Sequence, residues 1–171
     1  MASGPGGGLS IEQFLAQGTA ALDRGAVDEA TEQFTLAIMS NPSHPAAYCY
    51  RGECRAATED YAAAAADFAK ATEIAPEMGF AWRFLAESHC AAGDLAESEA
   101  AYQRAVEVVN DADTRVAYAA MLGRIGQAER ALDAYDNAIS WLDANGSTAA
   151  ADGDEDEAAA AVPWREIWLG R

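Results

Sequence analysis

WRFLAESHCAAGDLAESEAAYQRA, residues 82–105, contains two helical patterns on either side of Gly93. The second pattern places a small residue, an aromatic residue and an alanine at Ser98, Tyr102 and Ala105. The same string occurs three more times, as Ala30/Phe34/Ala37, Ala64/Phe68/Ala71 and Ala131/Tyr135/Ala138. The aromatic residues of the four strings are separated by 34, 34 and 33 residues, and a fixed period of this length indicates a repeat architecture.

An upstream helical pattern precedes each of these strings. It begins with an aromatic or long residue and carries a small residue four positions later, in the pairs Phe14/Gly18, Tyr48/Gly52, Trp82/Ala86 and Arg115/Ala119. Turn-forming residues separate the two patterns of each copy, so each copy is predicted to be an antiparallel helical hairpin. The small residues let the two helix axes approach each other. We expect eight helices and no β-sheet, with the helices near 11–24, 27–40, 45–58, 61–75, 79–92, 95–109, 112–125 and 128–143.

The combined pattern resembles the tetratricopeptide repeat (TPR) family, whose 34-residue motif runs W-x2-L-G-x2-Y, then A-x3-F, then P. The copy that begins at Trp82 carries Leu85, Ala86 and His89 at the next three motif positions, and Pro42 and Pro76 end the first two copies. The resemblance covers residues 11 to about 145. It implies an all-α fold, a right-handed α-solenoid of four hairpins (11–44, 45–78, 79–111 and 112–145) with a short C-terminal tail helix. Residues 1–10 are expected to form a flexible N-terminal tail.

The composition indicates an acidic intracellular protein that binds neither nucleic acid nor a membrane. The formal charge of −17 would repel phosphate backbones. No apolar run approaches the roughly 18 residues that a membrane-spanning helix needs. The three cysteines are too few and too irregular for a disulfide framework and fit a reducing compartment. We therefore expect a cytoplasmic or, alternatively, a nuclear location.

The resemblance also implies where a partner binds, because the first helix of each hairpin lines the concave groove in this family. Matching positions predict a mostly apolar groove that holds a peptide or helix, with arginines orienting an acidic residue of the ligand. Its candidate contact residues are Tyr50, Glu53, Phe80, Arg83, Phe84, Glu87 and Arg124. The aromatic residues of this set have a second interpretation, since each could simply cover the neighbouring repeat.

A known ligand mode of the family is a carboxylate clamp for the acidic C-termini of heat-shock chaperones. Its lysine, arginine and asparagine positions hold no basic residue here in either register of three repeats: Leu15, Thr19, Tyr50, Phe80 and Phe84, or Cys49, Glu53, Phe84, Asp113 and Ala117. A carboxylate bound without a cation or amide donor would be desolvated and unpaired, so a chaperone C-terminus is disfavoured as the ligand.

Catalytic and metal-binding patterns are not found, so we predict a protein that is not an enzyme and has no cofactor and no metal site. His89 and Cys90 are neighbours on a helix, and their side chains diverge by about 100°. Cys49 and Cys54 are five residues apart, whereas ligands on one helix face come three or four apart. Arg51 and Arg55 are interpreted as internal partners of Glu59 or Asp60 rather than as ligand contacts.

The C-terminal segment changes character twice. Residues 146–162 form an acidic and alanine-rich linker, and residues 163–171 follow as a docking or capping segment. One helical turn would place Trp164, Ile167 and Trp168 on one face, and two tryptophans are expected to be buried against something. The segment could be buried in three places: against the exposed end of the fourth repeat, in the chain's own groove, or against a partner. The function predicted from all of this is an adaptor or assembly factor, and the alternative is a permanent structural subunit of a larger complex.

Overall fold

The computed structural model describes residues 9–145, and within that range it contains helices and no strand. The helices are α1 (Ile11–Asp23), α2 (Val27–Ser40), α3 (Pro45–Ala57), α4 (Tyr61–Ile74), α5 (Gly79–Ala92), α6 (Leu95–Val108), α7 (Ala112–Arg124) and α8 (Ala128–Asn145). The expected all-α fold is confirmed, and each expected helix boundary agrees with the structure to within two residues. The expected linker, the docking segment and residues 1–8 of the N-terminal tail lie outside the described residues.

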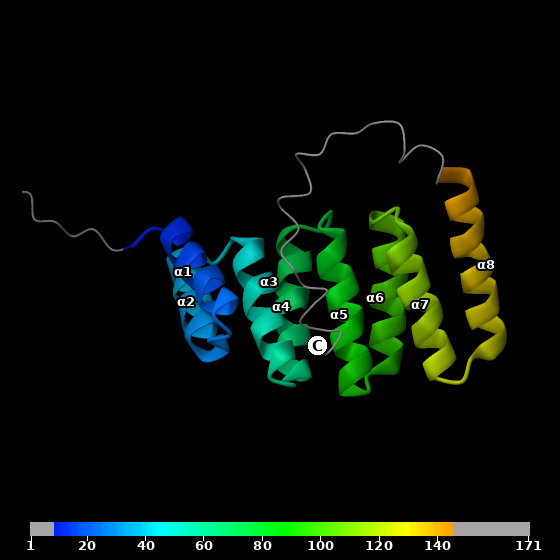
Figure 1. Ribbon diagram of the computed structural model, residues 1–171, viewed down its shortest axis with the longest axis horizontal. Helices are drawn as coiled ribbons and strands as arrows, with labels where there is room; N and C mark the ends of the chain where they lie inside the picture. The colour runs from blue at the N-terminus through cyan, green and yellow to red at the C-terminus, as the bar shows by residue number, and fades with distance from the viewer. Residues whose placement is uncertain (1–8, 146–171) are drawn as a thin grey trace, which may run out of the picture.

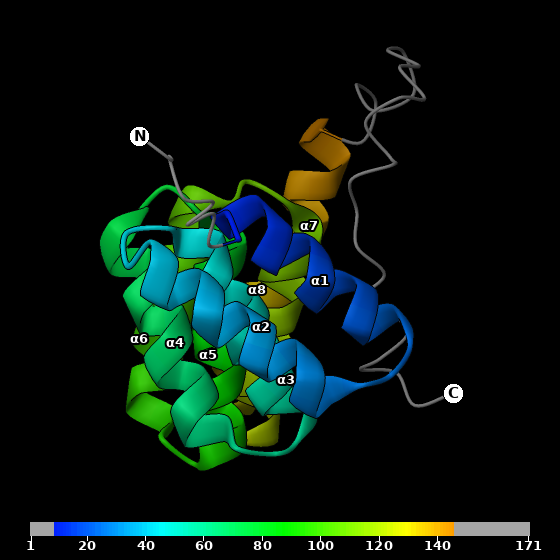
Figure 2. The same cartoon turned by 90° about the vertical axis from the view of Figure 1, so that its left-hand side faces the viewer.

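Consecutive helices lie side by side in chain order, so the hairpins α1–α2, α3–α4, α5–α6 and α7–α8 form one elongated array (Figure 1). Figure 2 looks along this array from its α1–α2 end and shows the later hairpins behind the first. None of the helices among residues 9–145 combines the length and the apolar character that crossing a membrane requires.

Turn chemistry fixes the reversal inside each hairpin. Gly25, Gly93 and Gly126 have φ values of 73°, 92° and 80°, a region that glycine enters without the steric penalty of a Cβ atom. In the second hairpin Glu59 takes this conformation, with a φ of 63°. Asp60 follows it and accepts a hydrogen bond from the backbone N–H of Ala63, which caps the N-terminus of α4.

Small residues allow the two helices of a hairpin to touch. A Cβ atom added to Gly18 would lie 2.4 Å from the Phe34 ring, and one added to Gly52 would lie 3.1 Å from the Phe68 ring. In the third hairpin the buried Ser98 hydroxyl donates a hydrogen bond of 2.8 Å to the Ala86 carbonyl oxygen. The small residues of the repeat pattern therefore have the steric role that the sequence predicted.

Candidate interaction surface

The expected groove residues lie on three first helices of the array. Tyr50 and Glu53 belong to α3, and they are three residues apart and so share a face. Four further residues, Phe80, Arg83, Phe84 and Glu87, are spaced along α5 at intervals of three and four residues. The Cys49 Sγ atom of α3 lies 3.7 Å from the Sδ atom of Met78, directly before α5, so the two helices meet at this point. We call these six residues of α3 and α5 the α3–α5 surface.

Arg124 is the one candidate outside α3 and α5. It is exposed in the last turn of α7. Burial raises the pKa of the Tyr102 hydroxyl, and the charges of Arg83 and Arg124 partly oppose this shift. Both arginines therefore lie near Tyr102.

Two of the aromatic residues in the surface pack against the preceding hairpin. The Tyr50 ring stacks on Phe34 of α2 with ring centroids 5.1 Å apart. The Phe84 ring stacks on Phe68 of α4 at 5.5 Å. A third stacked pair, Tyr102 and Tyr118, joins α6 to α7 at 5.7 Å. Tyr50 and Phe84 thus cover the neighbouring repeat, which is the second of the two interpretations given for these aromatic residues above. Their stacking joins each hairpin to the one before it.

Tyr118 was not among the candidates from the sequence. The signal was present, because Tyr118 follows Phe84 by the same 34 residues that separate Phe84 from Tyr50. Phe80 differs from these stacked rings. It meets Phe84 edge to face at 6.4 Å and keeps 44% of its surface exposed, so part of an apolar side chain remains open to solvent.

Glu53 has a carboxyl group without a counter-charge. Its Oε2 atom is buried and has no hydrogen-bond partner among the described residues. Burial raises the pKa of this carboxyl group to about 9, and no cation opposes the shift. The pKa values of Cys49 and Tyr50 are raised by burial first and by the charge of Glu53 second, which places the carboxyl group close to both.

Glu87 on α5 differs because it has a cation beside it. Burial raises its pKa, and Arg83 opposes that shift from one helical turn away, with Nε 4.0 Å from Oε1 of Glu87. The Arg83 guanidinium also lies over the Phe84 ring, 5.2 Å from its centroid. Arg83 therefore compensates the carboxyl group of Glu87, whereas the carboxyl group of Glu53 has no such cation beside it.

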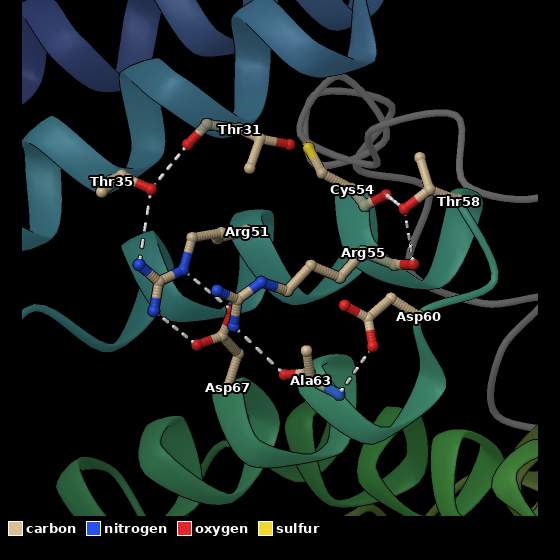
Figure 3. A network of polar contacts seen from close by, with 9 residues as sticks. All are labelled: Thr31, Thr35, Arg51, Cys54, Arg55, Thr58, Asp60, Ala63 and Asp67. Carbon is tan, nitrogen blue, oxygen red and sulfur yellow. Dashed lines mark hydrogen bonds and ion pairs between the residues drawn. The ribbon is translucent and has the colours of Figure 1, made fainter.

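The expectation for Arg51 and Arg55 was right about their internal role and wrong about their partner. Figure 3 shows both side chains converging on Asp67 of α4. Arg51 donates two hydrogen bonds to the Asp67 carboxylate, of 2.9 and 2.7 Å, and Arg55 donates one of 2.8 Å. The Asp60 side chain instead caps α4, where its Oδ1 atom accepts a hydrogen bond from the backbone N–H of Ala63.

One pairing near His89 was missed in the sequence. The Asp94 carboxylate lies 3.3 Å from Nδ1 of His89, just beyond the C-terminus of α5. Burial raises the pKa of Cys49 to about 12 and that of Cys54 to about 11, which keeps both as neutral thiols at physiological pH. Among residues 9–145, no three His, Cys, Asp or Glu side chains cluster as metal ligands do.

Comparison with known proteins identifies the repeat. Family models described as tetratricopeptide repeat match residues 15–79 and 77–144. The Hsp70-Hsp90 organizing protein of Triticum aestivum is 32% identical over 93 residues, which cover 54% of this chain and 16% of that protein. The chain spans less than a fifth of the length of the curated relatives that it matches.

Solved structures share the fold at low identity. MamA superimposes with a TM-score of 0.74 at 15% identity, covering 80% of this chain and 81% of that one. The first TPR domain of Spaghetti (RPAP3), bound to the HSP90 peptide SRMEEVD, gives a TM-score of 0.65 at 18% identity and covers 68% of this chain and 93% of that one. These likenesses establish a common helical array.

Proposed function

This chain belongs to the tetratricopeptide repeat family, and we propose that it is a non-enzymatic adaptor that binds a peptide or helix of another protein at the α3–α5 surface. The observation that carries the proposal is Phe80, a large aromatic side chain left 44% exposed on a surface that also holds an uncompensated carboxyl group. A few side chains near the centre of an interface, aromatic ones among them, carry most of its binding energy. The Spaghetti structure supports the mode, because it contains a peptide bound to the same fold.

The partner that this surface fits does not end in an acidic chaperone motif. A carboxylate ligand needs cations or amide donors, and the α3–α5 surface presents the carboxyl groups of Glu53 and Glu87 instead. Its arginine, Arg83, already pairs with Glu87. The relatives named for heat-shock proteins therefore support peptide binding as the function of this chain. The chemistry of the ligand is inferred from this chain's own residues.

The test is a quantitative pull-down with the full chain and Phe80→Glu, followed by mass spectrometry. Leu95→Glu is the matched control, because Leu95 is 42% exposed and also lies in the first turn of a helix, α6. We expect Phe80→Glu to weaken capture of the principal partner by at least about tenfold, as the loss of a central aromatic contact does. Leu95→Glu should capture as the parent does. Equal capture by all three folded proteins would remove the α3–α5 surface as the binding site.

A second candidate function, a permanent subunit of a larger complex, is favoured by one observation on α8. Leu132, Tyr135, Ile139 and Leu142 recur along one face of this helix and are all exposed, Leu132 by 65%. An open end of this kind normally needs a cover in a solenoid. A stoichiometric partner that stays bound through high salt and is lost in Ile139→Glu would establish this function. A chain that purifies as a monomer and binds its partner reversibly would exclude it.

A further inference from the structure

Glu53 differs from the array's other acidic side chains of similar burial. Asp67 receives three hydrogen bonds from Arg51 and Arg55, and Glu87 has Arg83 beside it. The Oε2 atom of Glu53 is buried and has no hydrogen-bond partner among residues 9–145. A carboxyl group of this kind is costly unless a donor reaches it.

The cations of the array are engaged elsewhere. Most basic side chains among residues 9–145 bind a carboxylate, as in Arg24–Glu29, Lys70–Glu73, Arg104–Glu107 and Arg130–Glu99. Arg115 bonds to the side chains of Asn110 and Asn137, and Arg124 is exposed at the far end of α7. A cation that satisfies Glu53 must therefore come with a bound segment.

The surroundings of Glu53 define that segment further. The aromatic rings of Tyr50, Phe80 and Phe84 lie on the same surface. Aromatic rings attract cations through their faces and pack against other aromatic side chains. The ligand that fits is a short segment in which an arginine or lysine is flanked by large aromatic residues.

The chain itself contains such a segment. Residues 163–171 read PWREIWLGR, with Arg165 directly after Trp164 and three residues before Trp168. Of the eleven basic residues, only Arg165 and Arg171 follow Arg130. The preceding stretch, residues 146–162, is acidic and has no cation of its own to offer.

The length of the connection allows this segment to reach α3. Residues 146–163 number 18, and a fully extended chain of that length spans about 60 Å. Five helix-to-helix steps of roughly 10 Å separate α8 from α3 at most, which gives about 50 Å. The r.m.s. span of a flexible linker of 18 residues is about 21–25 Å, so the linker must be stretched to reach α3. Tethering still raises the effective concentration of the segment, although it stays below the value for a linker that matches the span.

We propose that Glu53 accepts the cationic side chain of a bound segment, and that in the isolated chain this side chain is Arg165. Trp164 and Trp168 then lie against the aromatic side chains of the α3–α5 surface. The inference rests on the proposed function, because it assigns an internal occupant to the same surface. An external partner must displace this occupant, and the partner's own segment must carry an arginine or lysine.

The test follows acrylamide quenching of Trp164 and Trp168 in the full chain at neutral pH. Their emission is the difference between the parent and Trp164→Ala/Trp168→Ala, since the other two tryptophans are common to both. Glu53→Gln, Arg165→Gln and the double variant are compared with two controls. Glu32→Gln changes an exposed glutamate of α2, and Arg171→Gln changes the other basic residue of the tail. Circular dichroism confirms that each variant is folded.

The expected result is a protected, blue-shifted signal from the two tail tryptophans in the parent. Glu53→Gln and Arg165→Gln should each lower the ratio of closed to open chains by about tenfold, the scale of a charge-assisted hydrogen bond. The double variant should be no more open than either single variant, because both remove the same contact. The two controls should leave the signal unchanged.

Three outcomes would overturn the proposal: freely quenched tail tryptophans in the parent, single effects that multiply in the double variant, or equal effects of Arg165→Gln and Arg171→Gln. Protection that survives Glu53→Gln and is lost in Ile139→Glu would show that the segment covers α8 instead. A pull-down that stays sensitive to Phe80→Glu in any of these cases would leave the adaptor function standing while this inference fails.

Discussion

Replacing Asp67 with asparagine removes one negative charge from the interior of the second hairpin and keeps the shape of the side chain. Asp67 is 3% exposed and holds both Arg51 of α3 and Arg55 one turn further on (Figure 3). A guanidinium group keeps its proton with or without a partner, so both arginines remain charged in the variant. Asp67→Asn therefore leaves two neighbouring cations without a counter-charge.

The magnitude follows from the burial of the three side chains. Removing one partner of a buried ion pair costs about 3–5 kcal/mol. The side chain of Arg51 is 15% exposed and that of Arg55 is 30% exposed, so water compensates part of the loss. We expect Asp67→Asn to lower the free energy of unfolding by about 3 kcal/mol, at the low end of that range. Most of this should be coupled to Arg51, which makes two of the three hydrogen bonds.

The loss of stability is measured by urea denaturation followed by circular dichroism. Tryptophan fluorescence serves as a second probe to check that unfolding is a single transition. Asp67→Asn is compared in the parent and in the Arg51→Met background, where its cost should fall by about 1.5–3 kcal/mol. A further variant, Arg51→Met/Arg55→Met/Asp67→Leu, should be close to neutral, because apolar groups can replace a buried ion cluster. A cost of Asp67→Asn below 1 kcal/mol, or an equal cost in both backgrounds, would refute the reasoning.

Two further predictions concern packing and charge. In thermal unfolding, Gly18→Ala should destabilise the chain by about 1–3 kcal/mol, because the new Cβ atom would lie 2.4 Å from the Phe34 ring. Gly123→Ala should instead stabilise α7 by about 0.5–1 kcal/mol, because the nearest neighbour of its Cβ atom would be 3.9 Å away. The last prediction concerns the Arg165→Gln background, in which the pKa of the Glu53 carboxyl group is about 9 in the folded chain and 4.5 in the unfolded chain. Between pH 5 and 8, only the unfolded state therefore releases the carboxyl proton of Glu53. The chain should therefore lose stability as pH rises, by at most about 1.4 kcal/mol per unit, and Glu53→Gln should abolish that slope in urea titrations.

The helices and their pairing could be predicted because the same residue pattern occurs in all four repeats. The aromatic residue of the second helix and the small residue of the first helix mark their contact, and Gly18 against Phe34 is the clearest case. The turn residues allowed the helix ends to be predicted. Only α8 extends by two residues beyond its predicted end, to Asn145. Local chemistry was sufficient for these features.

The partner of Arg51 and Arg55 could not be found in the same way. The acidic residues that follow Arg55 most closely in the sequence are Glu59 and Asp60, both within five residues. Asp67 lies on the opposite helix of the hairpin, 16 residues from Arg51. The available signal was an aspartate inside the alanine-rich α4, directly before the buried Phe68, since an acidic residue at such a position needs a cation from a neighbouring helix.

The isolated carboxyl group of Glu53 and the lack of basic residues at the clamp positions have a common physical origin in this sequence. Clamp positions in the family hold lysine, arginine or asparagine, whereas Tyr50 and Phe84 at such positions stack on Phe34 and Phe68. These rings strengthen the contact between hairpins and supply neither a cation nor an amide donor for a ligand carboxylate. Polar recognition on α3 is then left to Glu53, one turn beyond Tyr50, and an acidic group selects a basic ligand. In the proposal made above, the sign of the ligand's charge is thus set by how the array packs its own repeats.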